Sequence, residues 1–157
     1  MGVLRSGSLT ALACATGAAW LAGGGCGSQS HVVPPACIAA AQDVERALGT
    51  APGPVALSDG TPLSRCVAQA TSDGDLQNVG AVFSQAADDL ALRARRDHTA
   101  ALRLGYLIGA IRRGAAHNQG ISAELVRRVE QSASLPVSAP DVSAAVHAGM
   151  VAGQRSG

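Results

Sequence analysis

Residues 97–120, DHTAALRLGYLIGAIRRGAAHNQG, decide the class of fold. Between Leu104 and Ile111 the side chains are apolar on nearly every side of a helix. A helix of that kind is buried, either in the middle of a protein or in a membrane. Charged residues bound the apolar run on both sides, and it is far shorter than the ~20 residues that a membrane span needs. We therefore expect this helix at the centre of a soluble bundle.

A stripe of small residues runs along the same segment. Ala101, Gly105 and Gly109 recur every four residues, so they lie on one side of the helix. Small residues at this spacing let the backbone of another helix come close. The stripe predicts a packing groove for a second helix.

Helical spacing of apolar residues continues on both sides of this central segment. In residues 37–49 it predicts a helix whose apolar stripe consists of Cys37, Ala41, Val44 and Leu48. The predicted fold is all-α, a compact bundle of four to six helices, with its core in residues 37–135. Residues 136–157 are expected to form a weak helix, from about Pro140 to Gly153, and a tail. Their high Gly and Ala content makes this helix the part expected to fray or to lie outside the core.

Several of the predicted helix starts carry N-cap signals. Ser72, followed three residues later by Asp75, is typical of the capping arrangement that opens a helix, and it begins the longest predicted one. Asp97 is expected to cap the central helix. Thr61 is expected to cap a short helix with Pro62 at its first position.

The N-terminal residues 1–25 have the parts of an export signal. Arg5 supplies a positive n-region, and the apolar stretch LTALACATGAAWLAG follows before Cys26. This arrangement resembles a bacterial lipoprotein signal, in which cleavage exposes a cysteine whose thiol receives diacylglycerol. The resemblance implies lipid attachment at Cys26 and a short linker over residues 26–36. It also implies a location on the outer face of the cytoplasmic membrane.

The match to the lipoprotein pattern is partial. Gly24 and Gly25 supply the small residues before the cysteine, whereas Gly23 stands where the pattern has Leu, and Leu21 lies two residues too early. Two alternatives therefore stay open. One is ordinary secretion, with cleavage after a small residue such as Ala22 or Gly24, and the other is that the segment is a core helix.

The four cysteines bear on this choice. Cys14 lies in the apolar part of the signal and would be removed with it. If Cys26 carries lipid, Cys37 and Cys66 remain as an even pair in an oxidising compartment. Both point toward the predicted core, so we expect a disulfide that closes a loop of about 30 residues and contributes ~3–4 kcal/mol.

The sequence offers little to catalysis, metal binding or nucleic-acid binding. The net charge is +1 and only 2% of the residues are aromatic, so no basic patch with stacking side chains is expected. No C-x-x-C pair and no hydrolase motif occur. The four histidines, expected in surface or capping roles, are His31, His98, His117 and His147. We predict no enzyme activity, no cofactor and no metal.

Three pairs of adjacent arginines admit two interpretations. They could gather into one surface that meets anionic headgroups, or they could be solvated helix faces. Adjacent residues diverge by about 100° on a helix, which favours the second interpretation. The pairs are Arg95–Arg96, Arg112–Arg113 and Arg127–Arg128.

Residues 73–131 also resemble small exported proteins of high-GC Gram-positive bacteria. The segments that carry this resemblance are LQNVGAVFSQAADDL, LGYLIGAIRRGA and GISAELVRRVE. The resemblance implies no particular activity. We expect a cell-envelope lipoprotein, held to the membrane through Cys26, that presents a helical domain to an envelope protein or supports the envelope. The alternative is an exported carrier that binds a small apolar ligand between Ala- and Gly-rich helices.

Overall fold

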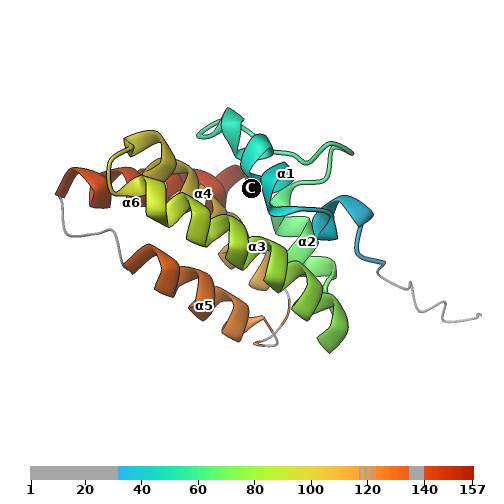
Figure 1. The fold of residues 1–157 in the computed structure, drawn as a ribbon. Helices are drawn as coiled ribbons and strands as arrows, with labels where there is room; N and C mark the ends of the chain where they lie inside the picture. The colour runs from blue at the N-terminus through green and yellow to red at the C-terminus, as the bar shows by residue number, and fades with distance from the viewer. Residues whose placement is uncertain (1–31, 117, 119, 121, 135–139) are drawn as a thin grey trace, which may run out of the picture.

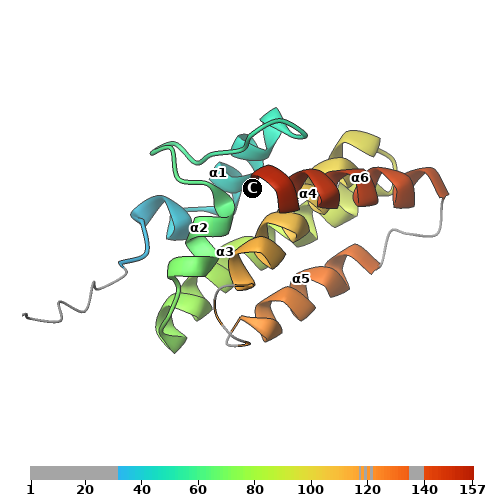
Figure 2. The same ribbon diagram turned by 180° about the vertical axis from the view of Figure 1, so that it is seen from behind.

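The computed structural model describes residues 32–116, 118, 120, 122–134 and 140–157. Within these residues the chain forms α-helices and two short 3-10 helices, and the only β pairing is an isolated bridge between Ala56 and Pro62. The prediction of an all-α bundle is confirmed (Figures 1 and 2). The elements in chain order are η1 (Pro35–Ile38), α1 (Ala41–Ala47), η2 (Leu48–Thr50), α2 (Leu63–Gln69), α3 (Asp73–Ala94), α4 (His98–Ala115), α5 (Ala123–Ser134) and α6 (Pro140–Ser156).

The longest helix, α3, begins where its capping signal predicts. The Ser72 hydroxyl accepts a hydrogen bond from the backbone N–H of Asp75 at 3.1 Å, and it also bonds the Asp75 carboxylate at 2.7 Å. Asp97 caps α4 in the same manner, because its carboxylate accepts the N–H of Thr99 at 2.8 Å. Both helix starts are therefore fixed by local side-chain chemistry.

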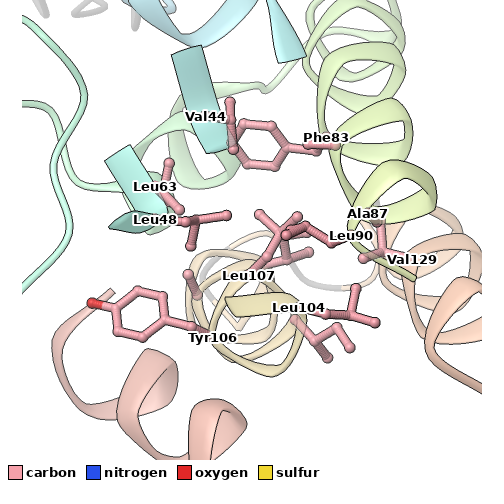
Figure 3. Packing of buried hydrophobic residues seen from close by; sticks show 14 of the residues in the cluster. Val44, Leu48, Leu63, Phe83, Ala87, Leu90, Leu104, Tyr106, Leu107 and Val129 are labelled. Atoms are coloured by element: carbon pink, nitrogen blue, oxygen red, sulfur yellow. The ribbon is translucent and has the colours of Figure 1, made fainter. Parts of the chain in front are cut away.

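Helix α4 lies at the centre of the bundle, as predicted. It packs against α2, α3, α5 and α6, and its residues from Leu104 to Ile111 are all buried. Figure 3 shows Leu107 of α4 beside Leu90 of α3, and the Tyr106 ring extending from α4 toward the ribbon of α6. The large side chains Phe83 and Tyr106 are fully buried in this core.

The N-terminal part of the bundle is less regular than the predicted helix over 37–49. Residues 35–38 form η1, the backbone at Ala40 is extended with φ −150° and ψ 150°, and α1 begins only at Ala41. The apolar stripe survives this break, because Cys37, Ala41 and Val44 are all buried. The core face was therefore predicted correctly although the element was divided.

The prediction that Thr61 caps α2 is wrong. Helix α2 begins at Leu63, and no side chain caps it. Thr61 instead belongs to a tight turn, in which its carbonyl accepts the N–H of Leu57 at 2.9 Å and its N–H donates to the Asp59 carboxylate. Pro62, predicted at the first helical position, instead occupies the N-cap position, so Thr61 lies one residue too early to cap the helix.

Helix α6 differs most from its prediction as a weak, fraying C-terminal segment. It runs from Pro140 to Ser156 and lies along α4 (Figure 2), and Val142 and Val146 are buried. The Gly content that weakens an isolated helix has the opposite effect here, because it removes the side chains that would hold the two backbones apart.

Candidate functional site

The structure brings Cys37 and Cys66 together as a disulfide. The bond joins η1 to α2, with Cα atoms 5.5 Å apart and a sequence separation of 29 residues. Both residues are fully buried. The predicted pairing is confirmed, and it fixes the first described segment of the chain to the body of the bundle.

The predicted small-residue stripe faces α6. A Cβ atom placed on Gly105 would lie 2.8 Å from the carbonyl carbon of Val146, and one on Gly109 would lie 2.8 Å from the amide nitrogen of Gln154. Ala101, one turn before Gly105, is fully buried. Gly105 and Gly109 are thus positions of backbone-to-backbone contact.

Two further glycines complete this interface from the other side. A Cβ atom on Gly149 would lie 2.8 Å from the amide nitrogen of Tyr106, and one on Gly153 would lie 2.9 Å from that of Ala110. Each helix therefore contributes a G-x-x-x-G pair. The contacts advance by four residues on both helices together, so α4 and α6 run in the same direction. Sequence reasoning missed the second pair, although GMVAG at 149–153 repeats the spacing of GYLIG at 105–109.

A buried phenol links the ends of this interface to the loop before α2. The Tyr106 hydroxyl accepts the backbone N–H of Val55 at 3.2 Å and shares a hydrogen bond with the Ser156 hydroxyl at 3.2 Å. Ser64 on α2 donates to the carbonyl of Gly157 at 2.6 Å. These bonds satisfy polar groups that would otherwise be costly to bury, and they fasten the end of α6 to the core.

An open groove lies between α3 and α5, with a volume of about 430 Å³. Its apolar lining consists of Leu76, Gly80, Ala81 and Leu125, and its polar lining consists of Gln77, Ser84, Glu124 and Arg128. The Ser84 hydroxyl is buried without a hydrogen-bond partner among the described residues. The groove combines an apolar floor with an unused hydroxyl and a cation, which suits a small amphiphile better than a reacting centre. No sequence motif pointed to it.

Glu124, which lines the groove, is stabilised in its charged form. The hydrogen bond from Arg127, followed by the charges of Arg127 and Arg128, lowers the pKa of Glu124 below its ordinary value. Arg127 is bound to Glu124 at 2.7 Å and 2.9 Å. Arg128 therefore supplies the cation that faces the groove.

The three arginine pairs do not form one surface. Arg112 bonds Glu130 of α5 at 2.7 Å, and Arg113 donates to the carbonyl of Arg155 at the end of α6. Arg95 and Arg96 instead line a separate hollow of about 480 Å³ at the α3–α4 corner. Arg112 and Arg113 thus bond to other helices. Arg127 forms an ion pair within α5, and Arg128 lines the groove.

The remaining predicted candidates are scattered or lie outside the described residues. His98 and His147 are exposed, whereas His31, His117, Cys14 and Cys26 fall outside the part of the chain that the structure describes. Among the described residues, no three His, Cys, Asp or Glu side chains gather closely enough to hold a metal ion. The Asp97 carboxylate is engaged by the N–H of Thr99.

None of the helices in the described ranges has the length and apolar character needed to cross a membrane. Comparisons with protein-family models, with curated proteins and with solved structures found no match for the chain.

Proposed function

We propose that the protein is an exported lipoprotein of the cell envelope, anchored through lipid on Cys26, whose helical domain is presented for binding to an envelope protein or for structural support. The observation that carries this proposal is the Cys37–Cys66 disulfide. A buried structural disulfide is typical of a protein that folds in an oxidising compartment outside the cytoplasm.

The disulfide also bears on Cys26. It consumes both cysteines of the described residues, and Cys14 lies within the predicted signal. Cys26 is then the one cysteine of the exported chain without a partner in the same chain. An unpaired thiol in a secreted chain is unusual. The segment before Cys26 resembles a lipoprotein signal, so attachment of diacylglycerol would account for this thiol. Buried acyl chains contribute about 0.8 kcal/mol per methylene, so two or three chains hold a domain firmly.

The test compares the full chain with a Cys26→Ser variant in a bacterial host that processes lipoproteins. A clickable fatty acid fed to the cells should label the parent protein and leave the variant unlabelled, and only the parent should sediment with membranes. Cys14→Ser is the matched control and should behave like the parent. If Cys26→Ser stays labelled and membrane-bound, or if the parent is found unlabelled in the medium, the anchor does not exist.

A second candidate function rests on the groove between α3 and α5. The tight α4–α6 contact leaves no volume for a ligand between those two helices, whereas the groove offers about 430 Å³ beside the Ala- and Gly-containing face of α3. In this alternative the protein carries a small apolar molecule with an anionic end. The apolar part would contact Leu76 and Leu125, and Arg128 would face the charge.

Titration with a fluorescent fatty acid tests the carrier. Ala81→Leu places a larger side chain in the groove and should weaken binding. Gln85→Leu adds a similar apolar group on α3 outside the groove and should leave binding unchanged. Equal binding by both variants, or no saturable binding by the parent, contradicts the carrier.

A further inference from the structure

The first eight described residues form an apolar, uncharged edge of the domain. Val33 and Cys37 point into the core, while Val32 is 74% exposed and Ile38 is 42% exposed. Pro35 is exposed on the same segment, and no charged residue occurs from 32 to 42. We call the exposed residues Val32, Pro35, Ile38 and Ala39 the N-terminal edge.

Large apolar side chains are rarely exposed elsewhere in the described residues. Apart from Val32 and Ile38, only Leu92 and Val151 belong to this group. Leu92 is followed in sequence by Arg93, Arg95 and Arg96 and lies near the α3–α4 corner, and Val151 lies on α6. Two of the four exposed large apolar residues are therefore within one short segment, which is unusual for a surface that faces only water.

The N-terminal edge lies close to Cys26 in the sequence, and this closeness indicates what covers it. Only five residues separate Cys26 from Val32, and an extended chain across these six peptide steps reaches at most about 20 Å. Helix α3 alone, with 22 residues, is about 33 Å long. A lipid on Cys26 would thus hold the N-terminal edge within reach of the bilayer, while the α3–α4 corner lies at the opposite end of the molecule (Figures 1 and 2).

We infer that the N-terminal edge rests on the lipid bilayer, so that the domain is oriented on the membrane and not merely tethered to it. This inference depends on the proposed lipid anchor. The disulfide holds η1 against α2, so the edge and the bundle are oriented together. The occupant is the interfacial region of the bilayer, where apolar side chains with uncharged surroundings are accepted. The α3–α4 corner would face away from the anchored end.

The chain offers a clean probe for this orientation. Trp20 is its only tryptophan and lies in the predicted signal, so the processed protein would contain none. Ile38→Trp places one tryptophan on the edge, and Leu92→Trp places one on an exposed position at the far end. Both substitutions replace exposed apolar residues, and circular dichroism verifies that each variant keeps the parent helix content.

The experiment uses the lipidated full protein in phosphatidylcholine–phosphatidylglycerol vesicles, with and without brominated acyl chains. Ile38→Trp is expected to emit at shorter wavelength than in detergent-free buffer and to lose emission to the brominated lipid. Leu92→Trp should show neither change. Adding Val32→Glu to Ile38→Trp should restore the emission while the protein still floats with the vesicles.

Three results overturn the inference. If the Ile38→Trp variant floats with the vesicles but its tryptophan emission is not quenched by brominated lipid, the domain is tethered without touching the bilayer. Stronger quenching of Leu92→Trp shows the opposite orientation. A blue shift that follows protein concentration and not lipid shows that a second copy of the chain covers the edge. Failure of the parent to float is a different outcome, because it removes the lipid anchor and the inference with it.

Discussion

Gly105→Ala should destabilise the domain, although alanine is the better helix former. The new Cβ would lie 2.8 Å from the carbonyl carbon and 2.9 Å from the Cα of Val146, and closer still to the carbonyl oxygen. Carbon atoms in contact normally lie about 3.5–4.0 Å apart. Because the obstacle is backbone, it cannot rotate away as a side chain could. The two helices must separate locally by roughly 1 Å.

The expected magnitude follows from two opposing effects. A gap of about 0.5–1 Å forfeits a quarter to a half of the dispersion energy of each affected contact, and overpacking of a core typically costs about 1–3 kcal/mol or somewhat more. Replacing glycine by alanine within a helix returns about 1 kcal/mol. Because the obstacle is backbone, we take the upper end of that range, about 3 kcal/mol, and expect Gly105→Ala to lower the free energy of unfolding by about 2 kcal/mol. For a domain of this size the melting temperature should fall by roughly 6–10 °C.

Urea unfolding followed by circular dichroism measures this change. Gly74→Ala is the matched control, because it lies in α3 and its Cβ would meet only the Ser72 hydroxyl at 4.0 Å. It should leave the midpoint unchanged or raise it slightly. The explanation of the α4–α6 interface is refuted if Gly105→Ala is as stable as Gly74→Ala.

Three further changes probe other parts of the structure. Replacing Cys37 and Cys66 together by alanine removes a cross-link between residues 29 apart and should lower the free energy of unfolding by about 3–4 kcal/mol, and an unchanged urea midpoint would contradict this. Tyr106→Phe leaves the N–H of Val55 without its acceptor and should cost about 1–3 kcal/mol, whereas equal stability would show that the bond contributes nothing. The pKa of Asp97 is lowered from 3.8, chiefly by the backbone hydrogen bond that it accepts, so its contribution is present above that pH and is lost on acidification. The stability difference between the parent and Asp97→Asn should therefore shrink as the pH falls below 3.8, and a difference that does not vary with pH would count against this cap.

The features that could be predicted from the sequence depend on local chemistry. Ser72 and Asp97 mark helix starts because a hydroxyl or carboxylate at that position satisfies free N–H groups. The apolar run of α4 had no polar face to expose, so its central position followed directly. Cys37 and Cys66 fell on inward stripes, and an oxidising compartment made their pairing the natural expectation.

The features that could not be predicted depend on how distant segments meet. The helix over 140–153 looked weak because glycine is unfavourable in an isolated helix, yet Gly149 and Gly153 fit against α4. Their spacing matches that of Gly105 and Gly109, and comparison of the two motifs could have revealed the interface. The loop before α2 gave no such signal, because its burial depends on the Tyr106 hydroxyl, 51 residues away from Val55.

The groove between α3 and α5 also arises only on folding. Ser84 and Arg128 belong to different helices. In the sequence of its own helix, each occupies a position that looks like any other at least partly exposed one. Their convergence depends on α3 and α5 running side by side, which no local pattern encodes.

Intact-mass analysis of the protein purified from membranes tests the central proposal most directly. The account predicts a chain that begins at Cys26, carries the added mass of diacylglycerol on that residue, and does not react with an alkylating reagent until reductant opens the Cys37–Cys66 bond. A chain of unmodified mass that begins after Ala22 or Gly24, or one that retains residues 1–25, would contradict the lipoprotein proposal.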